Sequence, residues 1–476
     1  MTPVAGPDGS MVLATSPWGP TGQGEVYALD TSGRVRAGWP FAPKGVAAFA
    51  TPAIASDGTV YVLGWAFGKG APLAPDSNPA WIWALDPAGH GKPGWPQAVA
   101  GSPFAGDSAL VVRPGGGVVY TESVVSGGSP AYRAVALDAN GRLVPGWPVA
   151  LPGFPLCYAA PCASTAAGAD GTWYALAQLD GAPDAEILAL HPDGTRVSGW
   201  PVRVPGGEGV LLGPGGTVYA WGLDTNGVNP SAGLPKIVRT RFVELGPNGR
   251  PKPVWPVTID GPASIPTIGA DGTLYATTGG GAGQVERVLA LGPNGAERAG
   301  WPLTLPADLV AYPYGPSPGM PARATGPSVA PDGTVYLPVY RAGEIGAASQ
   351  ALLAITPTGQ PAAGWPVWLP EGARFGFVGE FMTDGGGELV QLVLGQDGTV
   401  YAAVDLGTTV ESHAAGVVMA FDRAGHQPPG WPLLPPSGAT GLTHVVGLGL
   451  DGRGDLVTTA QTDSGATTVV SVVPIP

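Results

Sequence analysis

Charge, cysteine and long apolar runs are all scarce in this sequence of 476 residues. Only 12% of the residues are charged, and the formal net charge is −13. Because an acidic chain repels phosphate backbones and anionic lipid, we expect neither a nucleic-acid partner nor docking on a membrane. The apolar runs, such as "AVAL" at 134–137, are far shorter than a membrane-spanning helix of roughly 20 residues, so we expect no membrane insertion.

The two cysteines, Cys157 and Cys162, stand five positions apart in "PLCYAAPCAS". They are either two unpaired small side chains or a short-loop disulfide, and a disulfide would favour an oxidising compartment. With no histidine nearby the pair is a poor zinc site. The N-terminal "MTPVAGPDGSM" lacks the basic and apolar stretches of a signal peptide.

Glycine and proline are abundant instead, with 78 and 55 copies, and they separate apolar runs of β type. One phrase recurs nine times: an apolar run, a tight Asp-Gly or Gly-Gly turn, and a β-branched or aromatic run, as in "TPAIASDGTVYVL" from Thr51. Such a turn between two such runs is the strongest short signal for a β-hairpin. The Asp of each turn is expected to be a turn former, because its side chain bonds its own backbone.

A second phrase ends in Trp-Pro and occurs eight times, at spacings of 46 to 66 residues. A strand, an Asx-Gly type of turn and a short strand opening with Trp-Pro make up each copy. Proline cannot donate to a ladder, so this last strand is expected at the outer edge of its unit. The tryptophans, expected to be structural spacers between units, are Trp39, Trp95, Trp147, Trp200, Trp255, Trp301, Trp365 and Trp431.

Each unit therefore has four antiparallel strands, which we name A to D, and such units in series predict an all-β, β-propeller fold in one domain. A parallel β-helix is the rival, but its coils are shorter and lack hairpin turns. Nine repeats are counted, the last with only three strands, and the alternative is eight blades with a surplus terminal segment. The approximate repeats are 1–45, 46–101, 102–153, 154–205, 206–260, 261–306, 307–370, 371–436 and 437–476.

The stretch "DGTVYVLGW…WIWALDPAGHGKPGW" resembles the pyrroloquinoline-quinone-type β-propeller repeat, with a Gly-Trp-Pro variant of the tryptophan docking motif. The resemblance implies an alanine on strand C, matched by Ala84, and a tryptophan opening strand D that packs between adjacent blades, matched by Trp95. It would also imply a quinoprotein dehydrogenase. Those enzymes have adjacent cysteines over the quinone, which Cys157 and Cys162 do not reproduce, so we expect no cofactor.

Function is expected on one face of the propeller. Alternating strand directions place the uniformly short A–B and C–D turns on one face and the long B–C and D–A loops on the other, where binding usually resides. Aromatic and charged residues in these loops suit a protein or glycan partner. The candidate binding residues are Trp65, Phe67, Tyr312, Tyr314, Arg323, Arg374, Phe375, Phe377, Glu380 and Phe381. The alternative is that these aromatics cap the propeller's own core.

We find no catalytic signature and no metal site, because the turns offer too few oxygen ligands for calcium. The chain is therefore interpreted as a non-catalytic binding or scaffold protein. The alternative is a carbohydrate-active hydrolase or lyase, which needs two carboxylates facing one pocket. Its candidate acids and bases are Glu344, Glu371, Glu380, Asp405, Glu411, His413 and His444.

A purely structural role is a further hypothesis. The last repeat ends on strand C, so its edge could accept a strand from a partner chain or a second copy. The location predicted for such a module is extracellular or on a particle surface, as part of a larger and in one reading viral assembly.

Overall fold

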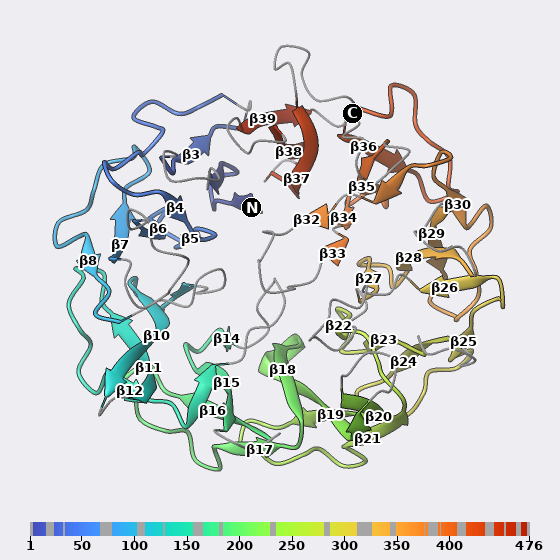
Figure 1. The fold of residues 1–476 in the computed structure, drawn as a ribbon, viewed down its shortest axis with the longest axis horizontal. Coiled ribbons are helices and arrows are strands. Elements are labelled where there is room, and N and C mark those ends of the chain that lie inside the picture. Colours follow the sequence, from blue (N-terminus) through green and yellow to red (C-terminus); the bar gives the residue numbers. More distant parts are fainter. Residues whose placement is uncertain are drawn as a thin grey trace.

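The computed structural model describes residues 3–15, 23–31, 34–66, 79–101, 110–126, 129–155, 165–179, 184–228, 235–279, 286–311, 326–342, 349–375, 377–378, 389–390, 392–406, 416–433, 442–451, 454–462 and 468–473. Among these residues the regular structure is all β apart from one 3₁₀ turn at Pro214–Gly216. Antiparallel sheets stand side by side around a ring, so the fold is the predicted β-propeller (Figure 1).

The first four blades follow one plan, with strands in order from the ring axis to the rim. Blade 1 holds β1 (Val4–Ala5), β2 (Met11–Ala14) and β3 (Val26–Leu29). Blade 2 holds β4 (Ala48–Phe49), β5 (Ala53–Ile54), β6 (Val60–Trp65), β7 (Ala80–Leu85) and β8 (Gln97–Ala98). Blade 3 holds β9 (Val111–Val112), β10 (Val118–Ser126), β11 (Ser129–Leu137) and β12 (Val149–Ala150). Blade 4 holds β13 (Gly153–Pro155), β14 (Thr165–Ala167), β15 (Trp173–Leu179), β16 (Ala185–Leu190) and β17 (Val202–Val204).

The next four blades repeat the plan. Blade 5 holds β18 (Gly207–Leu212), β19 (Val218–Val228), β20 (Pro235–Leu245) and β21 (Val257–Asp260). Blade 6 holds β22 (Thr267–Ile268), β23 (Leu274–Thr278), β24 (Arg287–Leu291) and β25 (Leu303–Thr304). Blade 7 holds β26 (Leu309–Ala311), β27 (Ser328–Val329), β28 (Val335–Arg341), β29 (Gln350–Ile355) and β30 (Val367–Trp368). Blade 8 holds β31 (Arg374–Phe375), β34 (Leu392–Leu394), β35 (Val400–Asp405) and β36 (Gly416–Phe421).

Two further sheets complete the described strands. A two-stranded hairpin, β32 (Phe377–Val378) and β33 (Leu389–Val390), is inserted in blade 8 and lies inside the ring (Figure 1). The chain's last sheet joins β37 (Leu442–Leu450), β38 (Leu456–Thr462) and β39 (Thr468–Val473), and it stands between blade 8 and blade 1 (Figure 1). The ring therefore has eight blades with a Trp-Pro segment, the number held as the alternative. The ninth repeat counted in the sequence forms this extra sheet of three strands.

Tight turns at one end of the strands fix the hairpins. In blade 2 the Asp57 carboxylate accepts the Thr59 backbone N–H at 2.9 Å, and Gly58 adopts a φ of 81° that L residues rarely take. Asp170 and Asp271 make the same bond with Thr172 and Thr273, each at 3.0 Å. The Asp side chains thus do act as turn formers, and the repeated local signal builds the repeated hairpin.

The Trp-Pro segments lie on the outer edges of the blades and bind the next blade. The Trp147 indole N–H donates to the Pro192 backbone carbonyl in the C–D turn of the following blade, at 3.2 Å. The same bond, at 3.0 to 3.2 Å, is made by Trp39, Trp95, Trp200, Trp255, Trp301 and Trp365. All eight Trp-Pro peptide bonds are cis. Seven contacts between successive blades therefore use one repeated hydrogen bond.

We call the indole-to-carbonyl bond between two blades the Trp clamp. The residue before the tryptophan is part of this contact. A Cβ on Gly146 would lie 2.1 Å from the Asp193 carbonyl oxygen of the next blade, so only glycine allows the close approach. The exception is Val254, which takes a positive φ of 75° with its side chain 70% exposed.

The tyrosines of the second strand add a second inter-blade contact. Tyr61 meets Trp95 of its own blade edge-on, with ring centroids 5.6 Å apart. Its hydroxyl accepts the Gly117 N–H from the neighbouring A–B turn at 2.8 Å. The Tyr219 hydroxyl also bonds the A–B turn of the next blade, but as the donor, to the Gly272 carbonyl at 3.0 Å. Buried aromatic and hydrogen-bonded contacts together fix the spacing of the blades.

Candidate functional site

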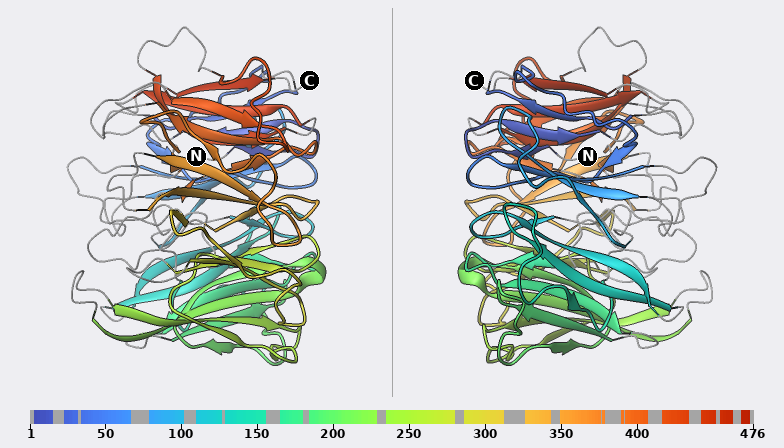
Figure 2. Two further views of the ribbon diagram at one scale, coloured as in Figure 1. Left: turned by 90° about the vertical axis from the view of Figure 1, so that its right-hand side faces the viewer. Right: turned by 90° about the vertical axis from the view of Figure 1, so that its left-hand side faces the viewer.

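The two faces of the disc differ in what they carry. Seen from the side, the strands run from one face to the other (Figure 2). The turn face bears the A–B and C–D turns, such as Asp57–Gly58 and Asp86–Gly89, and all seven Trp clamps lie there. The loop face bears the B–C and D–A connections, and the contacts there differ from blade to blade. The loop face is therefore the candidate binding face.

A buried ion pair holds the loop face of blade 3. Glu122 on β10 stands opposite Arg133 on β11, and the carboxylate lies 2.5 Å from the guanidinium. The Glu122 side chain is only 1% exposed, and its second oxygen accepts the Gly101 N–H at 3.1 Å. Both oxygens are bonded, so this carboxylate ties the connection from blade 2 to blade 3 and is not free for chemistry.

In blades 6 and 7, two side chains at equivalent positions, Glu286 and Gln350, each hold the connection to the following blade. The Glu286 carboxylate accepts the Ala311 N–H at 2.5 Å, and the Gln350 amide oxygen accepts the Phe375 N–H at 2.7 Å. Each residue precedes or opens the third strand of its blade and bonds the first strand of the following one. Burial raises the pKa of Glu286, and the bond from Ala311 partly offsets this effect.

A Glu286→Gln variant is expected to unfold at a higher temperature than the parent at pH 7. A raised pKa in the folded state means that ionised Glu286 costs stability, and that this cost appears as the pH rises above the ordinary value of 4.5. Glutamine keeps the acceptor, as Gln350 shows in the next blade, without the charge. Thermal unfolding between pH 3 and pH 8 should give a Tm difference that closes on acidification. A constant difference at every pH would contradict the titration.

Blades 4 and 5 hold their loop-face connections with partly exposed ion pairs. Asp184 pairs with Arg203 at 2.7 Å and also accepts the Gly206 N–H at 3.2 Å. Asp224 pairs with Arg241 at 3.1 Å across β19 and β20. These carboxylates are thus spread around the rim of the face, each beside its own cation.

The structure places the candidate binding residues that it describes in different environments. Trp65 ends β6, half-buried, opposite Ala80. Arg374 is half-buried on β31, opposite Asp405. Phe375 is 0% exposed, so it is a core residue rather than a ligand contact, because its strand turns it into the packing between blades 7 and 8. Phe377 lies on β32, in the hairpin beside β37.

Other sequence candidates lie outside the described residues. They are Phe67, Tyr312, Tyr314, Arg323, Glu380, Phe381, Glu344, Glu411, His413, Cys157 and Cys162. Of the candidate acids and bases that are described, Glu371 is exposed in a turn, Asp405 ends β35 and His444 lies on β37. These three groups belong to different segments of the chain: the connection after blade 7, strand β35 and strand β37.

One loop-face contact was missed by the sequence reasoning. The Arg341 guanidinium lies over the Trp368 ring, 4.6 Å from its centroid. Arg341 ends β28 and is exposed, and Trp368 ends β30 and is half-buried. The residues are 27 positions apart, and only the pairing of β29 with both strands brings them together. Because Arg341 and Trp368 stand at the ends of two separate strands, no short stretch of the sequence indicates that they are in contact.

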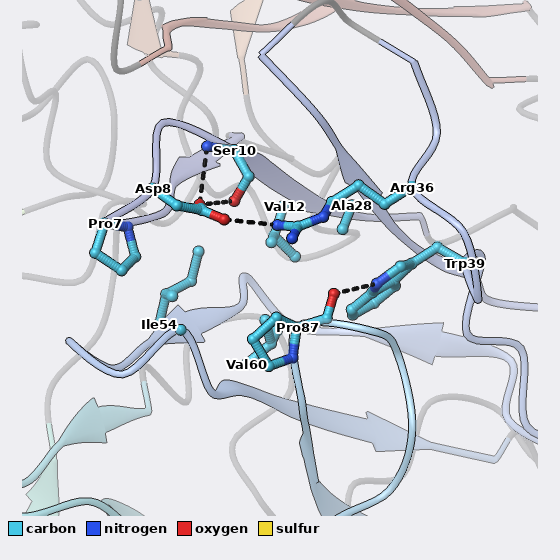
Figure 3. A pocket seen from close by; sticks show the side chains of 11 residues that line it. Pro7, Asp8, Ser10, Val12, Ala28, Arg36, Trp39, Ile54, Val60 and Pro87 are labelled. Carbon is cyan, nitrogen blue, oxygen red and sulfur yellow. Dashed lines mark hydrogen bonds and ion pairs between the residues drawn. The ribbon is translucent and has the colours of Figure 1, made fainter.

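A small hollow on the turn face lies between blades 1 and 2 (Figure 3). Asp8 accepts from Ser10 and from Arg36, the latter at 2.8 Å, and the Trp39 indole donates to the Pro87 carbonyl. The Ser10 hydroxyl bond is the largest cause that lowers the pKa of Asp8. Asp8, Ser10 and Arg36 bond one another within blade 1, and the Trp39 indole bonds Pro87 of blade 2, so the hollow is part of the scaffold.

Within the described ranges, no cluster of three or more His, Cys, Asp or Glu side chains is placed to hold a metal ion. Nor does any helix of those ranges have the length and apolar character needed to cross a bilayer.

Solved structures of similar shape cover most of the chain. A crystal structure of a eukaryotic initiation factor superposes with a TM-score of 0.51 at 10% identity, covering 90% of this chain and 86% of that one. The Dos1 propeller gives 0.46 at 9% identity, covering 87% and 89%. The GH74 xyloglucanase from Xanthomonas campestris gives 0.36 at 14% identity, covering 100% and 74%. At these identities the likeness concerns the fold alone, and the β-propeller itself is shown by the ring of antiparallel sheets.

No protein-family model matches the sequence, and no curated protein matches it either. The resemblance to the pyrroloquinoline-quinone-type repeat therefore stays a prediction from the Ala and Trp positions.

Proposed function

We propose that the chain is a non-catalytic propeller that recognises a protein or glycan partner through its loop face. One observation carries the proposal. The repeated contacts that assemble the ring, the Trp clamps and the tyrosine bonds, lie on the turn face, whereas each blade presents different side chains on the loop face. A rigid ring with one varied face suits recognition.

The chemistry of the described loop-face residues supports a polar, partly aromatic contact surface. The exposed Arg341 lies over the half-buried Trp368 on blade 7, and the half-buried Arg374 follows on blade 8. Tryptophan and arginine are the side chains that most often anchor interfaces. The buried carboxylate of Glu122 and the half-buried carboxylate of Glu286 are tied to backbone N–H groups, which favours a holding role over acid–base catalysis. A location outside the cell or on a particle surface is part of this proposal.

The test is binding of the purified chain to a glycan array and to surfaces of the source cells. A loop variant replaces residues 312–325 and 379–388 by Gly-Ser linkers, and so keeps β26 and β31 intact. The matched control carries His90→Ala and His426→Ala, two exposed turn-face changes. We expect the parent and the control to bind alike and the loop variant to bind at least about tenfold more weakly. Equal binding by the loop variant, or loss in the control, would refute the proposal.

A further inference from the structure

Arg341 is an exposed cation at the loop-face end of blade 7. In blade 5 the equivalent residue, Asp224, pairs with Arg241 of the third strand at 3.1 Å. The strand registers match Arg241 to Ala351 in blade 7, which carries no charge. Within the part of the chain that the structure describes, Arg341 forms no ion pair, and its guanidinium lies over the Trp368 ring instead.

Trp368 departs from the repeat at the place where Arg341 meets it. The small Ala351 lies opposite Trp368 on one strand and opposite Val339 on the other. Arg341 follows Val339 by two residues and so points to the same side of the sheet, where its guanidinium lies 4.6 Å from the ring centroid. At the position of Trp368 the other Trp-Pro segments carry Ala42, Ala98, Ala150, Arg203, Thr258, Thr304 and Leu434. Because those segments lack an indole here, closure of the ring does not require Trp368.

The contact with the ring holds the Arg341 guanidinium in place and leaves its edge for a ligand. A guanidinium is planar and stacks on aromatic faces, with five N–H donors arranged around its edge. A side chain that is already held loses less conformational freedom on binding. Carboxylate is an anion whose two oxygens match this fork, and such charge-assisted bonds are among the strongest that side chains form. The pair is therefore a prepared position for a carboxylate.

The segments around this position are mainly apolar. Residues 303–306 of blade 6 read Leu-Thr-Leu-Pro, and residues 367–370 of blade 7 read Val-Trp-Leu-Pro. Leu303 and Trp368 are half-buried and pack against one core cluster. Besides the indole, Thr304 is the only residue of the two segments whose side chain can hydrogen-bond. A glycan would leave most of its hydroxyl groups unpaired here, which costs affinity, whereas the apolar side chains of a protein suit this surface.

We propose that Arg341, held on Trp368, binds an Asp or Glu side chain of a protein partner, and that apolar residues beside this acid pack on Leu303 and the indole. The inference rests on the proposed function, because it takes the loop face as the recognition face. Arginine and tryptophan are the side chains that most often anchor protein interfaces. Since the chain as a whole has a net charge of −13, Arg341 marks one position for an acid rather than part of a broad basic surface.

The probe is a random peptide library displayed on phage, selected on the immobilised full chain after depletion on an Arg341→Gln variant. We expect the recovered peptides to share an Asp or Glu beside apolar residues. The most enriched peptide, labelled with fluorescein, should bind Arg341→Gln at least about tenfold more weakly than the parent in an anisotropy titration. The matched control is Arg250→Gln, an exposed arginine of a C–D turn on the turn face, which should bind like the parent.

A second version of the same peptide, with its acid replaced by the amide, shows whether the acid and Arg341 meet. On the parent the amide peptide should bind at least about tenfold more weakly than the acid peptide. On Arg341→Gln the two peptides should bind alike, because either change removes the same contact. Equal losses on both proteins would overturn the inference. Recovery of peptides without a carboxylate, or no enrichment on the parent over Arg341→Gln, would overturn it as well.

The glycan array that tests the proposed function separates the two failures. Array binding that is lost in Arg341→Gln would place the acid on a glycan, and so would overturn this inference while the proposed function stands. Array binding that is lost only in the loop variant, with no peptide dependent on Arg341, would have the same meaning. If the loop variant binds like the parent, the proposed function fails, and the acid and amide peptides still decide whether Arg341 reads a carboxylate.

Discussion

A Lys252→Val variant is expected to lose about 3–5 kcal/mol of unfolding free energy. Lys252 is the cation that pairs with Glu244, whose side chain is only 1% exposed. One Glu244 oxygen is buried without a hydrogen-bond partner, so the carboxylate depends on this cation. Removing one member of a buried pair leaves an uncompensated charge, which costs far more than the pair itself contributes.

The matched control is the double variant Glu244→Ala/Lys252→Val. Blades 3 and 4 carry Ala136 with Val144 and Ala189 with Val197 at the equivalent positions, so the ring already accommodates this combination. We expect the double variant to recover to within about 1.5 kcal/mol of the parent, or to exceed it. Urea unfolding of the three proteins measures the effect. A double variant as unstable as Lys252→Val would show that the charge pairing is not the cause.

The second large effect is expected at the Trp clamp. A Gly146→Ala variant is expected to lose about 2–4 kcal/mol, because its Cβ would lie 2.1 Å from the Asp193 oxygen and its φ is 88°. The clamp would have to open between blades 3 and 4, and the Trp147 bond to Pro192 would lengthen.

Gly430 offers the control within the same chain. It has a φ of 90°, and nothing lies within 4 Å of its Cβ position. A Gly430→Ala variant therefore carries the backbone strain alone, about 1 kcal/mol, without the steric conflict. Chemical denaturation should rank the parent first, then Gly430→Ala, then Gly146→Ala. Equal losses in the two variants would assign the whole effect to φ and none to the clamp.

The Lys252–Glu244 pair shows what local sequence could and could not predict. In blades 1 and 2 the equivalent cations Arg36 and Lys92 pair with the turn aspartates Asp8 and Asp57, at 2.8 and 3.6 Å. Blade 5 has Gly215 at the place of that aspartate, and Glu244 on the facing strand supplies the carboxylate instead. Glu244 stands where the other repeats mostly have alanine. Its pairing with Lys252 becomes clear only once the structure places the A–B and C–D turns side by side.

Phe375 and Arg374 show the same limit on the loop face. Both were predicted as binding residues from a segment rich in aromatics and charge. The structure places Phe375 in the core and leaves Arg374 half-buried on the same short strand. Successive strand residues point to opposite sides, and which side is inward depends on pairing with β35. Composition could not supply that register.

The sequence by itself determined the repeat, the hairpin turns, the outer Trp-Pro strands and hence the β-propeller. These features follow from local signals, since Asp-Gly fixes a turn and proline excludes a central strand. The tertiary structure alone decided the contacts in the seams, such as the bond from the Trp147 indole to the next blade, and the ion pair of blade 5. Those contacts join residues of different blades, and their geometry is set by closure of the ring rather than by any short stretch of chain.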